Sequence, residues 1–405
     1  MTAVTSTVAD KYQVPALFAP YVGKINDLDA HEAIPVSHWR EEFGSAVGDF
    51  VEAQMKLVFN PNADKDESEI NAHNVWNLKM EQAPGAFDVQ RRMKVIDFVG
   101  IDRQIIFPGG LGQQAIYLYN KADDPNAFKD IKTNRKQYAH KLIECHNDWC
   151  VRAWRGQTRL RTVAILLEDN VDDMYTTLKT LIDKGVRLFQ LSCTKPPGGV
   201  SPADPAMDRV WALASEAGIA FAAHVDGSSA DGFLATQKWK HAPAFDGWKI
   251  GDEFALDPWT LTNLHLAVQN FITTLVLGGV FDRHQNLRFG VQEFGAHWVG
   301  PLAENMDRYY AHTPFPTDIG ERRLKMKPSD YIRKHVRVAP FYFEPVGQYI
   351  DRYGFEDVYC FATDFPHYEG GRKPMEDFAA SLAGQKEETV RKFMVENAKY
   401  IMPNN

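Results

Sequence analysis

The feature that most constrains the fold is a regular alternation of short apolar runs with helix-like segments. The runs have the length of buried strands and lie near residues 24–28, 103–107, 160–167, 187–193, 219–224, 287–294, 336–343 and 358–363. Strands that alternate with helices pair in parallel, with the helices as crossovers. Eight such units predict an α/β protein with a (β/α)8, or TIM-barrel, fold. The alternative is an open doubly wound sheet, but no Gly-x-Gly-x-x-Gly follows the first run.

The chain is longer than a minimal barrel. It has 405 residues, whereas a (β/α)8 barrel typically needs about 250. We expect an N-terminal arm at 1–24 and one barrel domain over 25–405. Stretches near 36–85, 228–258 and 312–335 break the alternation. We interpret them as insertions that cover the carboxyl-terminal mouth of the barrel.

Composition excludes several classes of protein. The net charge of −8 and the lack of a basic run argue against a nucleic-acid partner. No apolar stretch approaches the roughly 20 residues of a membrane span. The four cysteines are scattered and form no Cys-x-x-Cys pair, which fits a reducing cytoplasm. We therefore expect a cytoplasmic protein that acts on a small molecule.

Polar residues that could bind a metal stand at the ends of four apolar runs. They are His31, His224, Glu293 and Asp364. Asp27 and Asp29 precede His31 at two-residue steps, which in a strand places all three on one face. Taken singly, a satisfied core histidine or a capping aspartate explains each residue as well. Four such residues at four strand ends are hard to attribute to chance, and they predict a site for Zn, Fe or Mn at the barrel mouth.

Four further residues are weaker candidates. His367 in Asp-Phe-Pro-His could reach the same mouth and contact substrate, or be a surface histidine. His297 could carry protons or cap a helix, and Lys195 could bind a substrate carboxylate or be a solvated loop residue. Asp226 could orient His224 or cap a turn.

These motifs resemble the amidohydrolase-related proteins, in the branch around aminocarboxymuconate-semialdehyde decarboxylase. The resemblance runs from about Ile25 to the C-terminus, and its carriers are Asp27-x-Asp-x-His, Ala-x-His224, Glu293-Phe-Gly-Ala-His-Trp and Thr363-Asp-Phe-Pro-His. It implies a barrel with a divalent metal held by Asp29, His31, His224 and Asp364, and it implies a homodimer. The decarboxylases often have His or Glu at the position of Asp29. A histidine that moves protons commonly ends their sixth strand, where Glu293 stands here.

This second departure bears on the reaction. Histidine suits proton donation near neutral pH, and Glu lacks that property unless burial raises its pKa. Carboxylates at Glu293, Asp27 and Asp29 would add metal ligands and favour metal-activated water, with Asp364 or Glu293 as the base. We therefore expect a hydrolase that cleaves an amide, ester, lactone or thioester bond and uses one or two ions, preferably Zn. A non-oxidative decarboxylase of an aromatic or unsaturated acid is the alternative, and a non-catalytic metal-binding barrel is the third hypothesis.

Overall fold

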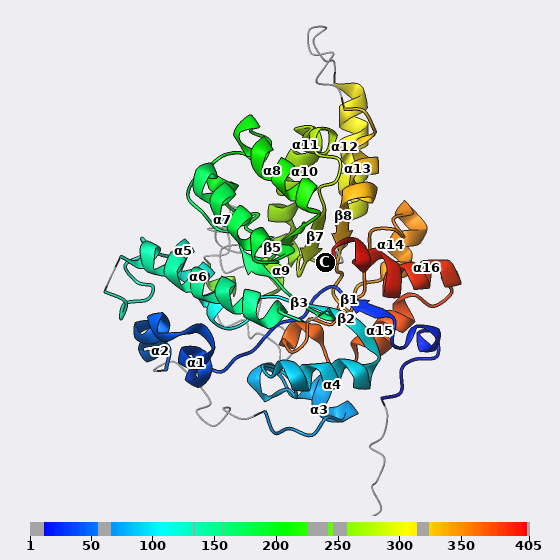
Figure 1. Ribbon diagram of the computed structural model, residues 1–405. Helices are drawn as coiled ribbons and strands as arrows, with labels where there is room; N and C mark the ends of the chain where they lie inside the picture. The colour runs from blue at the N-terminus through cyan, green and yellow to red at the C-terminus, as the bar shows by residue number, and fades with distance from the viewer. Residues whose placement is uncertain are drawn as a thin grey trace, which may run out of the picture.

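The computed structural model describes residues 12–55, 66–132, 134–156, 158–225, 242–245, 257–313 and 324–402. The strands are β1 (Ile25–Asp27), β2 (Ile101–Ile106), β3 (Leu160–Thr162), β4 (Ala164–Ile165), β5 (Leu188–Leu191), β6 (Ala220–His224), β7 (Phe289–Gln292) and β8 (Val336–Val338). They lie at the centre of the molecule, and the helices surround them (Figure 1).

The α-helices lie between the strands and after β8 along the chain. They are α1 (Trp39–Phe43), α2 (Gly48–Met55), α3 (Ala72–Asn77), α4 (Val89–Val99), α5 (Leu111–Asn120), α6 (Arg135–Trp154), α7 (Val171–Asp183), α8 (Asp208–Ala217), α9 (Pro258–Asn263), α10 (His265–Leu277), α11 (Val280–Arg283), α12 (Val299–His312), α13 (Pro328–His335), α14 (Val346–Tyr353), α15 (Pro374–Ser381) and α16 (Glu387–Arg391).

All strand pairs are parallel, as the alternation predicted. One sheet has the order β1-β2-β3 and the other has the order β4-β5-β6-β7-β8. Only Val163 separates β3 from β4, and its N–H donates to Ile106 in β2. The predicted third strand therefore bends once and takes part in both sheets.

The predicted eighth strand, 358–363, is not a regular strand, but it lies between β8 and β1. On one side Cys360 N–H donates to Val338 O, and on the other Leu28 N–H donates to Phe361 O. Isolated parallel bridges join Tyr359 to Val338 and Phe365 to Ala30. The arrangement is that of a (β/α)8 barrel, although these few bonds do not form a continuous ladder around it.

Small and apolar side chains fill the barrel. Leu28, Ile105, Val163, Ala222 and Cys360 belong to one buried cluster. Ile401 and Met402, near the C-terminus, belong to the same cluster. Tyr400 O–H donates to Leu287 O, just before β7 begins. The C-terminal segment therefore covers the amino-terminal end of the barrel. Polar groups at the other end remain available for chemistry.

More than one α-helix follows both β2 and β6. Helix α5 begins directly after Pro108-Gly-Gly and precedes α6. Between β6 and β7 the described residues form α9, α10 and α11. The described parts of the 36–85 insertion place Trp39, Phe43 and Phe50 in a second core with α5 and α6.

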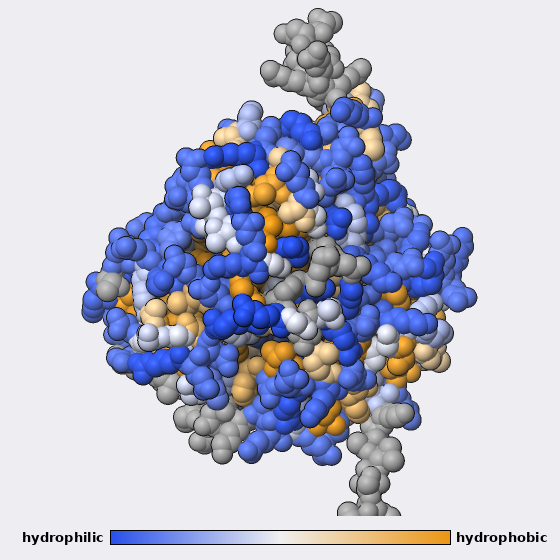
Figure 2. Space-filling view, viewed as in Figure 1, coloured by the Kyte–Doolittle hydropathy of each residue, from blue (hydrophilic) through white to orange (hydrophobic). Residues whose placement is uncertain are grey.

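The described part of the predicted N-terminal arm packs on the barrel, where Phe18 and Tyr21 join the main core. The face shown in Figure 2 is mostly hydrophilic, and its apolar residues form separate patches. None of the helices within the described ranges is long and apolar enough to cross a bilayer.

Candidate metal centre

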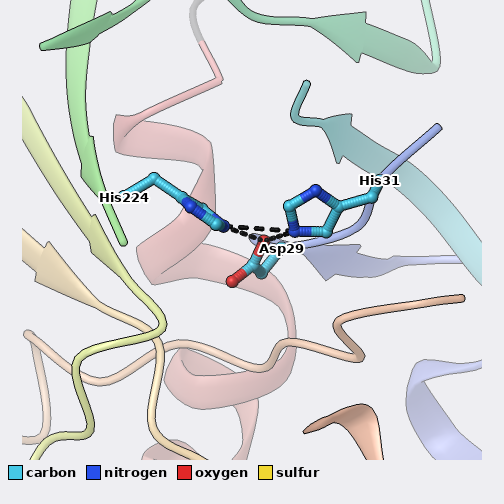
Figure 3. A group of neighbouring side chains, drawn as sticks. All are labelled: Asp29, His31 and His224. Atoms are coloured by element: carbon cyan, nitrogen blue, oxygen red, sulfur yellow. Dashed lines mark hydrogen bonds and ion pairs between the residues drawn. The ribbon is translucent and has the colours of Figure 1, made fainter. Parts of the chain in front are cut away.

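Three side chains from two strand ends converge at the carboxyl-terminal mouth. His224 at the end of β6 points toward His31, and Asp29 lies between them (Figure 3). The two Nε2 atoms are 3.1 Å apart, and Asp29 Oδ1 lies 3.5 Å from His31 Nε2 and 3.6 Å from His224 Nε2. All three residues are buried.

The outer ring nitrogens determine how these histidines face the centre. His31 Nδ1 lies 3.3 Å from Pro108 O, and His224 Nδ1 lies 2.7 Å from Val225 O. A carbonyl oxygen can only accept, so in these contacts each Nδ1 carries the hydrogen. A ring that carries its hydrogen on Nδ1 alone has a free lone pair on Nε2, so with a cation bound both Nε2 atoms could serve as its ligands.

Asp364 lies next to this group of three and contacts His31. Its Oδ1 lies 3.3 Å from His31 Nε2. Its backbone has φ 51°, a left-handed conformation that is uncommon for aspartate and marks a sharp turn at the end of the 358–365 segment. Both Asp364 oxygens and Asp29 Oδ1 are buried without a hydrogen-bond donor. Buried anionic oxygens without donors are costly, so two imidazoles and two carboxylates here fit a divalent cation.

Glu293 lies against this set. It follows β7 directly, has φ 61°, and its Oε2 is 3.3 Å from His224 Nε2. Burial, reinforced by the negative charges of Asp364, Glu369 and Asp29, raises the pKa of Glu293 well above 4.5. Burial lowers the pKa of His31, but the nearby carboxylates of Asp29 and Asp364, at 3.5 and 3.3 Å, outweigh this effect and raise it to about 10. The cluster thus carries an excess of negative charge that attracts protons or a cation.

His367 and Glu369, in the loop that follows Asp364, also reach the cluster. His367 Nδ1 is 3.2 Å from Asp364 Oδ1, and its ring stacks on His31 with centroids 3.7 Å apart. Glu369, which the sequence analysis missed, offers an oxygen within 4.8 Å of ligand atoms on Glu293, Asp364 and His367. Its only signal in the sequence is its place in the loop after Asp364.

Asp27 does not contribute to the centre, although the two-residue spacing placed it with Asp29 and His31. Its Oδ2 accepts from Gln104 Nε2 at 2.7 Å and from Thr363 Oγ1 at 2.6 Å. Its Oδ1 accepts from the N–H groups of Thr363 and Asp29 at 2.9 and 3.2 Å. A carboxylate with four donors joins the strand ends and has no need of a cation.

The remaining candidates lie elsewhere among the described residues or outside them. His297 lies outside the metal cluster. Its side chain is 45% exposed, and its Nδ1 is 3.6 Å from Glu344 Oε1. Lys195 lines a separate cavity of about 280 Å³ together with Tyr119 and Lys136. Asp226 lies outside the described residues.

Comparison with known proteins identifies the family. A sequence model described as "Amidohydrolase" matches residues 129–401, which is more than half of the chain. The chain belongs to the amidohydrolase family. This confirms the resemblance seen in the sequence motifs. No curated protein matches this amidohydrolase.

Solved structures share its fold. An amidohydrolase from Mycobacterium avium subsp. paratuberculosis K-10 has a TM-score of 0.60 and 22% identity, over 79% of this chain and 75% of that chain. The 5-carboxyvanillate decarboxylase from Sphingomonas paucimobilis has a TM-score of 0.57 and 14% identity, over 94% and 99%. A dihydroxybenzoic acid decarboxylase from a Polaromonas species, with bound manganese and an inhibitor, has a TM-score of 0.57 and 16% identity, over 93% and 96%. The (β/α)8 fold is confirmed, and a divalent metal is expected for the family.

Proposed function

We propose that this amidohydrolase is a divalent-metal-dependent, non-oxidative decarboxylase of an aromatic or unsaturated carboxylic acid. One observation carries the proposal. Asp29, His31 and His224 offer ligand atoms for one cation, Asp364 Oδ1 lies 3.3 Å from His31 Nε2, and the carboxyl group of Glu293 lies beside them, 3.3 Å from His224 Nε2. A carboxyl group next to a metal-bound acid can supply the proton that decarboxylation requires.

The sequence analysis preferred a hydrolase, partly because Asp27 could enlarge the ligand set toward two ions. Asp27 is saturated by four donors, so that part of the argument was wrong. The structures that match over most of both chains include decarboxylases of aromatic acids, which also supports the alternative over the original preference.

Each residue of the cluster would have a separate role in decarboxylation. Asp29, His31, His224 and Asp364 would hold the cation, which when bound supplies positive charge to orient the substrate carboxylate and stabilise the developing anion. As the C–C bond breaks, its electron pair stays on the substrate carbon and CO2 leaves. Glu293 then donates its proton to that carbon and regains one from water. His367, stacked on His31, fixes the direction of that ring.

The experiment uses the full chain loaded with Mn²⁺ and a panel of hydroxylated aromatic acids, with CO2 release as the readout. In D2O the product should carry deuterium at the carbon that lost the carboxyl group. Glu293→Gln should lower the rate at least about 100-fold while the cation content stays unchanged. Glu304→Gln removes an exposed carboxylate on α12 and should leave the rate intact.

Hydrolysis remains the second candidate, because Glu293, Asp364, His367 and Glu369 place enough ligand atoms together to hold a further ion. Cleavage of amides, lactones or thioesters without CO2 release from any acid would replace the decarboxylase with the hydrolase. A protein that binds Mn²⁺ and does neither would support the non-catalytic barrel.

A further inference from the structure

We infer that Glu344 is a positioning residue that holds Glu293 in place through the loop after β7. The inference deepens the proposed function and rests on it for the role of Glu293. Nothing in the sequence singled out Glu344, which follows the seventh predicted strand in Phe-Tyr-Phe-Glu.

The Glu344 carboxylate is the convergence point of two loops. Ala296 N–H lies 2.9 Å from both of its oxygens, and His297 N–H donates to Oε1 at 3.1 Å. From the loop after β8, Phe341 N–H donates to Oε2 at 2.8 Å. The Glu344 residue is only 6% exposed, so these charge-assisted bonds are protected from water.

The loop that Glu344 binds needs such support, because its backbone is strained. Glu293 has φ 61° and Gly295 has φ 67°, and the first of these is uncommon for a residue with a side chain. A Cβ at position 295 would lie 3.3 Å from His297 Nδ1 and 3.4 and 3.5 Å from the two Glu344 oxygens, so there is nearly room for a side chain. The left-handed φ, two residues after Glu293, is therefore what favours glycine in this turn.

Glu344 is itself anchored to the helices that follow it. Its carbonyl oxygen accepts from Ser381 Oγ of α15 at 3.0 Å, and Tyr349 O–H of α14 reaches its Oε1 at 3.4 Å. Phe341 and Tyr342 line a cavity of about 20 Å³ together with Glu293 and Asp364. The Glu344 carboxylate thus binds both the loop that carries Glu293 and the loop whose Phe341 and Tyr342 line the cavity beside it.

The same contacts explain His297. Its Nδ1 lies 3.6 Å from Glu344 Oε1 and its ring meets the His265 ring edge-on, with centroids 4.5 Å apart. This places His297 in the assembly around Glu344, whereas the sequence left open whether it carries protons or caps a helix. Among the described residues, the hydrogen bonds of the Glu344 carboxylate come from loop N–H groups and from Tyr349 O–H, so its effect on the reaction passes through the loop that carries Glu293.

The test combines Glu344→Gln with Glu293→Gln in a double-mutant cycle on the Mn²⁺-loaded protein. The glutamine side chain has one acceptor oxygen and a donor group that faces the loop N–H groups. Glu344→Gln should lower kcat about 10- to 100-fold, with KM within about 2-fold and cation content unchanged. Glu344→Asp should restore part of kcat, since it keeps two acceptor oxygens.

In the double variant, kcat should be no lower than in Glu293→Gln alone, because Glu344 acts through the residue already removed. Glu168→Gln is the matched control, a mostly buried carboxylate that accepts from Thr177 Oγ1 and lies outside the metal cluster. Unchanged kcat in Glu344→Gln, or independent losses in the double variant, would overturn the inference.

Hydrogen exchange separates this inference from the proposed reaction. The amides of Ala296, His297 and Phe341 should exchange faster in Glu344→Gln, whether or not the protein decarboxylates the chosen acids. Retained protection at these amides would refute the role of Glu344. Faster exchange in a protein without decarboxylase activity would refute the proposed function alone.

Discussion

At the scale of single residues, carboxylates at the barrel mouth differ by how many donors they already have. Asp27 accepts hydrogen bonds from two backbone N–H groups and two side chains, and Glu344 accepts them from three backbone N–H groups and Tyr349. Asp364 and the Oδ1 of Asp29 accept none. A saturated carboxylate gains little from a cation, whereas a buried and unsaturated one gains much. Saturation therefore separates the structural acids from the metal ligands.

Asp27→Asn tests the structural role. The amide keeps one acceptor oxygen and turns an NH2 group toward donors, so buried hydrogen bonds are lost. We expect the free energy of unfolding to fall by about 2–4 kcal/mol in urea titrations, with cation stoichiometry unchanged. Asp102→Asn, at a half-exposed carboxylate 3.9 Å from Arg159, should change stability by less than about 1 kcal/mol. Equal losses in the two variants would contradict this division.

At the scale of secondary-structure elements, His335 connects three of them. It ends α13, its Nδ1 donates to Leu287 O before β7 at 2.8 Å, and its ring stacks on Phe281 of α11 with centroids 4.2 Å apart. The residue is fully buried, and burial lowers the pKa of His335 to about 4. The folded protein therefore keeps this ring neutral at a pH where an unfolded chain would charge it.

The pH dependence of stability follows from this shift. Between about pH 6.5 and 4 the unfolded chain binds a proton at this position and the folded chain does not, so stability falls as the pH falls. His335→Gln should lose overall stability and also reduce this slope, by at most about 1.4 kcal/mol per pH unit. Denaturant titrations at a series of pH values would show it. An unchanged slope would mean that His335 is not buried neutral. His284→Gln, at a partly buried ion pair with Asp208, is the control.

At the scale of the whole molecule, the metal ligands come from the beginning, the middle and the end of the chain. Asp29 and His31 follow β1, His224 ends β6, and Asp364 lies in the segment that joins β8 to β1. The sheet ladders do not run continuously around the barrel. A cation held by these residues would link the two sheets and the closing segment at the mouth.

Removing the cation should therefore destabilise the barrel as a whole. We expect chelation to lower Tm and Mn²⁺ to restore it, by about 3 kcal/mol of stability at 100 times Kd. His224→Ala should stay folded but lose this response, as calorimetry with Mn²⁺ and with chelator would show. His38→Ala removes a histidine that lies outside the metal cluster, and this variant should keep the Mn²⁺-dependent rise in Tm. A full response in His224→Ala would exclude His224 as a ligand.

The sequence by itself determined the alternation of strands and helices and the type of residue at each strand end. These signals are local, because apolar periodicity and Gly or Pro breaks act over a few residues. It thus placed Asp29, His31, His224, Glu293 and Asp364 at one mouth. It could not tell Asp27 from Asp29, because only the fold brings Gln104 and Thr363 to Asp27.

Only the tertiary structure decided which groups are saturated and which remain unsatisfied. Glu344 lies far along the chain from Glu293, and its role depends on N–H groups that two separate loops direct at one carboxylate. Glu369 joined the cluster through the turn after Asp364. Hydrogen bonding and burial depend on neighbours distant in sequence, so no pattern along the chain carries that information.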